Sequence, residues 1–312
     1  MLKKIFFALC MAFAASQPPT EAVELKEITT PGAIVRYEPP LERAAADMAA
    51  AYPGIKADVE AKLGWRINSV PRIVLVHQHA EFRKETGSDL VTAFAVPAAH
   101  LIVMDYSKME RTPFDLRATL EHELCHLLLH ENIGASFLPK WLDEGTAQWV
   151  AGTADIIATG EKDILKQAVL SGNLLRLKDI SINFPEQPRA ILLAYEESRS
   201  FTEFIVHEYG AGKFLSVLDG LHKKMAVEQA VQGNLSIGLD VLEENWRRSL
   251  LRSYSWQAYL ADHLYWVLFF LAALGTIWGY LRLRNRIRNY RDEEDDGPPE
   301  EGETGEDPED RN

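Results

Sequence analysis

An uncharged hydrophobic run near the C-terminus constrains this chain more than any other sequence feature. Residues 264–281 contain no Asp, Glu, Lys or Arg. As a helix this run rises about 27 Å, close to the roughly 30 Å hydrocarbon thickness of a bilayer. Tyr and Trp residues lie near both ends, as in interfacial aromatic belts, and five Arg residues follow within residues 282–291. We therefore expect one C-terminal transmembrane helix, with the membrane lipid bilayer as a partner; a buried core helix is the alternative.

A shorter hydrophobic run lies at the N-terminus. It covers residues 5–15 after Lys3 and Lys4, and small residues follow it. Its length covers only about half of a bilayer, and the order of features is that of a secretory signal peptide. We expect residues 1–16 to be this signal; a buried strand is the alternative. With the Arg residues inside, the domain between the two runs is extracytoplasmic, periplasmic in a bacterium, and the C-terminus is cytoplasmic.

The acidic residues are concentrated in a C-terminal tail. The net charge is -13, and residues 292–312 hold 12 Asp/Glu and one Arg, so the rest of the chain carries only -2. The tail is rich in Pro and Gly and has little to bury. We expect residues 282–312 to form a disordered cytoplasmic segment, first basic and then acidic. Outside the Arg cluster no basic stripe is present, which argues against a nucleic-acid partner.

Residues 31–255 are expected to form the extracytoplasmic domain. Its strand-like segments come first and its helical segments dominate later, an order that favours an α+β class with a small N-terminal sheet and a mostly helical remainder. The expected strands are 33–37, 71–77, 92–96 and 101–104. The expected helices are 41–51 and 55–63, separated at Pro53-Gly54, then 114–130, 140–150, 161–170, 190–209, 212–222 and 239–254.

The expected helix over 114–130 carries the sequence His122-Glu123-Leu124-Cys125-His126. Residues four apart lie on one face of a helix, so on an amphipathic helix both imidazoles can reach one Zn²⁺. Glu123 projects about 100° away, beside the ion, where it can take a proton from a metal-bound water. Cys125 is the only cysteine after the signal. We expect it to pack as a small apolar residue; a redox role is the alternative.

A catalytic zinc site needs a third protein ligand. The segment Trp141-Leu-Asp-Glu144-Gly-Thr-Ala147 follows Pro139 and resembles the start of a second helix. Together, H-E-x-x-H and W-L-x-E-G-x-A resemble the gluzincin metallopeptidases, in particular the peptidase MA-like group. That resemblance implies a zincin-like catalytic domain, with Zn²⁺ held by His122, His126 and Glu144 and with Glu123 as general base. His130 is a rival ligand, but it lies about 12 Å along the helix from His122.

Two further roles remain open. Asp143 could orient a metal ligand or be an exposed carboxylate at a helix start. The segment from Ala194 is similar to the helix that follows the zinc helices in peptidase MA-like proteins, and there we take Tyr195 as the candidate oxyanion donor. A packed Tyr195, with His207 or Tyr209 in that role, is the alternative.

These features predict a membrane-anchored zinc metallopeptidase that hydrolyses peptide bonds in a peptide or protein substrate. By the same resemblance, an extended substrate pairs with a sheet edge beside the zinc helix, either 92–96 or 101–104. The alternative function is a non-catalytic, zincin-fold binding module anchored in the membrane. The retained Glu123 favours the enzyme. An intramembrane protease is disfavoured, because charged residues crowd the motif helix, among them Arg117, Glu121 and Glu131.

Overall fold

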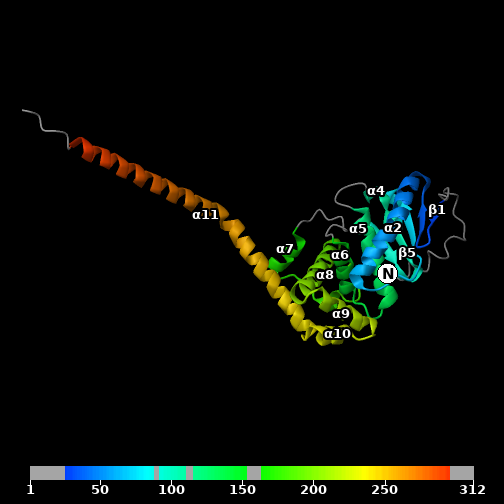
Figure 1. Cartoon of the computed structure of the whole chain (residues 1–312). Coiled ribbons are helices and arrows are strands. Elements are labelled where there is room, and N and C mark those ends of the chain that lie inside the picture. Colours follow the sequence, from blue (N-terminus) through cyan, green and yellow to red (C-terminus); the bar gives the residue numbers. More distant parts are fainter. Residues whose placement is uncertain (1–24, 88–90, 110–114, 153–162, 296–312) are drawn as a thin grey trace, which may run out of the picture. The chain divides into compact units, whose positions relative to one another are not determined.

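The computed structural model describes residues 25–87, 91–109, 115–152 and 163–295. It divides into two compact units, residues 1–251 and 252–312. In the first unit the sheet and helix α2 (Glu42–Leu63) lie on one side. Helices α8 (Pro188–Tyr209), α9 (Ala211–His222) and α10 (Val227–Leu235) lie on the other (Figure 1). The signal expected over residues 1–16 lies outside the described residues.

The sheet has five strands in the order β1-β2-β3-β5-β4. The three central strands are parallel, with Ile34 beside Arg72 and Arg72 beside Leu101, and the two outer strands are antiparallel to their neighbours. This places β4 at an edge and β5 inside, so of the two expected substrate edges only the one over 92–96 lies at an edge of the sheet. The strands are β1 (Lys26–Thr29), β2 (Ile34–Tyr37), β3 (Arg72–Val76), β4 (Ala93–Val96) and β5 (Leu101–Asp105).

Helix α2 (Glu42–Leu63) is one continuous helix where the sequence predicted two. Pro53 lies inside it, and Tyr52 and Ile55, on either side of the expected break, are both buried. A proline removes one backbone hydrogen bond and crowds the preceding turn. Here the burial of α2 against β2 and helix α5 (Leu116–Asn132) outweighs that local cost.

Helix α5 begins where the side chain of Asp115 accepts hydrogen bonds from the backbone N–H groups of Arg117 and Ala118. From Ala118 to Leu129 every residue is buried, so the helix is not amphipathic as predicted. The reason is that α2, β4 and α6 (Lys140–Ala151) all pack against it. The motif helix is therefore the central helix of the domain.

Helix α6 packs most extensively against α8 (Pro188–Tyr209). Gly145 makes this approach possible, because a Cβ atom there would overlap Thr202 Oγ1 and the carbonyl oxygen of Ser198. Three rings continue the core from α6 through α8 into α11 (Leu239–Asp295). Trp141 lies 5.2 Å from Phe201, and Phe201 lies 5.4 Å from Trp246, between ring centroids. All three are almost fully buried.

The remaining elements are mostly short. They are α3 (His79–Thr86), α4 (Tyr106–Met109), α7 (Ile164–Ser171), α9 (Ala211–His222), α10 (Val227–Leu235) and the 3-10 turns Pro39–Leu41, Pro97–Ala99 and Leu177–Ile180. The sequence did not predict β1, α3, α4 or α10. The order of a small sheet followed by many helices confirms the predicted α+β class.

Helix α11 (Leu239–Asp295) runs from the first unit into the second. Its segment His263–Arg284 has a mean hydropathy of 1.7, is 0% buried and is long and apolar enough to cross a membrane. The helix continues to Asp295, whereas the sequence predicted disorder from residue 282. Arg and Glu are good helix formers, and a helix already formed extends at little cost. Residues 296–312 lie outside the described part of the chain.

Candidate metal centre

The structure brings His122, His126 and Glu144 together. Their potential ligand atoms all lie within 4.8 Å of one another, and all three residues are buried. His122 Nε2 lies 3.1 Å from His126 Nε2, and each of these nitrogens lies 3.5 Å from Glu144 Oε2. Tetrahedral ligands at about 2.0–2.1 Å from a zinc ion are about 3.3 Å apart. The spacing of the three atoms therefore fits zinc.

The hydrogen bonds of His126 and Glu144 also suit a metal site. His126 Nδ1 lies 2.6 Å from Asp143 Oδ1, and since a carboxylate can only accept, Nδ1 carries the proton. In the neutral imidazole the lone pair then lies on Nε2 and faces Glu144 Oε2, which is buried with no hydrogen-bond partner in the described residues. Three electron-pair donors that face one another with no proton between them repel each other. A cation bound among them removes that repulsion.

Asp143 holds two imidazoles. Besides His126, it accepts from His130 Nε2, which lies 2.9 Å from its Oδ2 atom. His130 therefore points at Asp143 and belongs to a hydrogen-bonded chain behind the three convergent residues. Burial opposes ionisation of Asp143, but His126 and the hydrogen bonds from both histidines hold the pKa of its carboxyl below its usual range. In turn, burial lowers the pKa of His126, and the charges of Asp143 and Glu144 outweigh burial and raise it.

Glu123 is 3% exposed on the same helix. Burial raises the pKa of its carboxyl, while the neighbouring His122 and His126 oppose that rise. A carboxylate with a raised pKa is a better proton acceptor than an ordinary one at neutral pH. Cys125 is fully buried, and burial raises the pKa of its thiol, as expected for a packing residue rather than a reactive one.

Tyr195 lies on α8, close enough to Glu144 and Lys140 for their charges to act on its phenol. Its ring meets the ring of Phe184 edge-on at 5.0 Å between centroids. Burial and the charge of Glu144 raise the pKa of its phenol, which keeps the hydroxyl a donor. The two alternatives lie 12 and 14 residues further along α8, about 18 and 21 Å away along the helix axis. His207 is exposed there and contacts Glu208.

The sequence reasoning overlooked Lys140. Its Nζ atom lies 2.5 Å from Glu144 Oε1, four residues along α6. Burial would raise the pKa of Glu144, but Lys140 and His126 hold it well below its usual range. The signal was present in the sequence, because Lys and Glu four apart on a helix lie on the same face.

Comparison with known proteins gives a family and distant structural neighbours. A sequence profile described as the Peptidase MA superfamily matches residues 95–252, about half of the chain. No curated protein matches. One similar solved structure is a variant M1 zinc metallopeptidase from Deinococcus radiodurans bound to a Tyr-Ser-Ala substrate, at 14% identity, a TM-score of 0.42, and coverage of 73% of this chain and 51% of that chain.

A second similar structure is a two-domain M1 zinc metallopeptidase variant bound to L-tryptophan. It has 13% identity and a TM-score of 0.43, with the same coverage of 73% and 51%. This chain therefore spans about half the length of both structures.

Proposed function

The chain belongs to the Peptidase MA superfamily, and from that premise we propose that it is a zinc metallopeptidase of the gluzincin type that hydrolyses peptide bonds. The observation that carries the proposal is the convergence of His122 Nε2, His126 Nε2 and Glu144 Oε2 beside a buried carboxylate that is not part of the set. A structural metal site gains nothing from such a carboxylate.

In this proposal His122, His126 and Glu144 hold Zn²⁺. Bound zinc supplies a water of lowered pKa and polarises a carbonyl oxygen. Glu123 accepts a proton from the attacking water at a carboxylate oxygen and then delivers it to the nitrogen of the leaving amine. Tyr195 donates its hydroxyl proton in a hydrogen bond to the oxygen that gains charge. Asp143 keeps His126 in the tautomer that presents Nε2.

We also propose where the reaction takes place. Residues 31–255 form an extracytoplasmic domain, residues 264–281 cross the membrane, and the C-terminus is cytoplasmic. The support is the apolar, unburied segment of α11 and the Arg residues that follow it. Anchoring raises the local concentration of substrates near the membrane, so that modest affinity suffices.

The test is Glu123→Gln in the full-length protein in detergent. We expect wild type to bind about one zinc per chain and to cleave fluorescein-labelled casein, an unstructured polypeptide. The Gln variant should keep its zinc and lose about 10²- to 10⁴-fold in rate, because only the proton transfer is removed. A wild-type protein that binds zinc and cleaves neither casein nor a broad peptide library would favour the anchored binding module.

A further inference from the structure

The carboxylate of Glu144 has two oxygens in different surroundings. Oε1 lies 2.5 Å from the ammonium of Lys140, whereas Oε2 has no hydrogen-bond partner in the described residues and faces both imidazoles at 3.5 Å. The Glu144 side chain is 4% exposed, so hydrogen bonds from water do not make the surroundings of the two oxygens alike. Oε1 is therefore paired with the ammonium of Lys140, and Oε2 is available to bind a metal.

The position of Lys140 is set at its backbone, and its ammonium has one ring contact besides Glu144. Lys140 is the first residue of α6, and its backbone N–H donates to the carbonyl of Ser181 at 2.7 Å. Its Nζ atom lies 6.0 Å from the centre of the Phe184 ring, which itself packs on Tyr195. A short, charge-assisted hydrogen bond anchored in this way resists rotation of the carboxylate.

The number of oxygens that a carboxylate gives to a metal decides how many positions stay open. Carboxylates bind metals through one oxygen or through both. A catalytic zinc site has three protein ligands and keeps one position for water or substrate. If Glu144 turned to offer both oxygens, the additional oxygen would compete for that position.

We propose that Lys140 is a positioning residue that keeps Glu144 a one-oxygen ligand and thereby keeps a coordination position open. This inference rests on the proposed function. Lys140 itself touches neither the metal nor the reacting atoms in this account. Its effect is therefore on turnover and on coordination, rather than on whether a metal binds.

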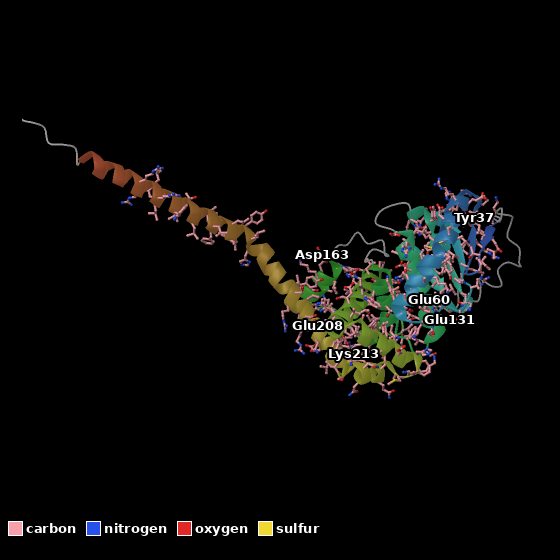
Figure 2. The ribbon with its side chains drawn as sticks, in the orientation of Figure 1. Tyr37, Glu60, Glu131, Asp163, Glu208 and Lys213 are labelled. Carbon is pink, nitrogen blue, oxygen red and sulfur yellow. The ribbon has the colours of Figure 1, made fainter. Side chains whose placement is uncertain are left out.

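The chain offers a matched control in helix α2. Lys56 and Glu60 are also four residues apart, with Nζ 2.5 Å from Oε1 and with a carboxylate that is 6% exposed. Glu60, labelled in Figure 2, has further partners in Arg66 and Ile67 and belongs to no metal cluster among the described residues. Lys56→Met thus removes the same kind of ion pair away from the site.

The experiment compares wild type with Lys140→Met, Lys140→Arg and Lys56→Met, all full length in detergent. Co²⁺ replaces zinc, because four-coordinate Co²⁺ absorbs visible light more strongly than Co²⁺ with more ligands. We expect Lys140→Met to bind one Co²⁺ per chain with a weaker visible band. With zinc, its kcat on labelled casein should fall about 10- to 100-fold at similar KM. Lys140→Arg should restore both readouts, and Lys56→Met should match wild type.

The outcomes separate the two proposals. Wild-type absorption and kcat in Lys140→Met would overturn the role of Lys140 and leave the metallopeptidase intact. A wild type that binds neither Co²⁺ nor zinc would overturn both. Should Lys140→Met fail to fold, a structure of the zinc-loaded wild type decides. Glu144 bound through Oε2 alone, with Oε1 on Lys140, supports the inference, and both oxygens on the metal overturn it.

Discussion

The Nδ1 atom of His126 lies 2.6 Å from the Oδ1 atom of Asp143, and the other oxygen of Asp143 lies 2.9 Å from His130. Asp143 thus sets the tautomer of one member of the candidate metal set from the neighbouring helix. We expect Asp143→Ala to weaken zinc binding about 10- to 100-fold, since the imidazole loses the group that orients it. Chelator competition measures the effect. His130→Ala, which leaves the Asp143–His126 bond in place, should have a smaller effect; equal losses would contradict this order.

Glu144→Ala should lower the zinc content below one per chain. The substitution removes the oxygen that faces both imidazoles, and two histidines alone make a weak site. Elemental analysis of the full-length protein after dialysis measures the content. Glu131→Ala is the control, because Glu131 is an exposed carboxylate near the C-terminal end of α5, the helix that carries His122 and His126, and is labelled in Figure 2. Unchanged zinc in Glu144→Ala would remove Glu144 from the ligand set.

Gly145→Ala should destabilise the domain by about 1–3 kcal/mol, because the new Cβ meets the backbone of Ser198 and α8 must move away from α6. Thermal unfolding measures the change. Gly54→Ala tests the specificity of the effect: nothing lies within 4 Å of a Cβ there, and Gly54 is inside α2. That variant should be more stable than wild type by about 0.5–1 kcal/mol. An unchanged melting temperature in Gly145→Ala would show that the α6–α8 contact is looser than described.

Glu197→Gln should flatten the dependence of stability on pH. Burial raises the pKa of Glu197 to about 8 from its ordinary value of 4.5, and its Oε2 atom has no hydrogen-bond partner in the described residues. Because the pKa of Glu197 is higher in the folded than in the unfolded protein, protonation of this carboxyl favours the fold at low pH. This contribution to the free energy of unfolding is lost as pH rises toward 8. The slope is at most about 1.4 kcal/mol per pH unit.

The amide of Gln keeps an oxygen for the N–H of Leu175 and does not ionise. Melting temperatures of both proteins between pH 5 and 8 should therefore diverge, with wild type falling faster. Glu203→Gln, at an exposed position of α8, should follow wild type. Parallel curves for wild type and Glu197→Gln would show that Glu197 is ionised in the folded protein throughout.

A reporter fused after Asn312 should behave as cytosolic, because Arg residues follow the apolar segment of α11 and positive charge is retained inside. Paired alkaline phosphatase and green fluorescent protein fusions distinguish the two sides. Phosphatase activity from the C-terminal fusion would reverse the proposed orientation.

The sequence by itself determined what is local and periodic. The spacing of His122 and His126 places both on one face of any helix, as the spacing of Lys140 and Glu144 does. The uncharged run over 264–281 likewise identifies a helix that can cross a membrane, because length and composition alone decide that property. The α+β order of strands and helices also follows from the pattern of apolar residues along the chain.

Only the tertiary structure decided what depends on contacts between distant segments. It gave Asp143 two imidazoles to hold, placed β4 and not β5 at the sheet edge, buried α5 on all sides and kept α2 continuous through Pro53. It also gave the two oxygens of Glu144 different neighbours, with Oε1 beside Lys140 and Oε2 facing both imidazoles. The physical reason is that a helix or strand is formed by neighbours in sequence, whereas burial, orientation and charge pairing arise when elements far apart in sequence pack together.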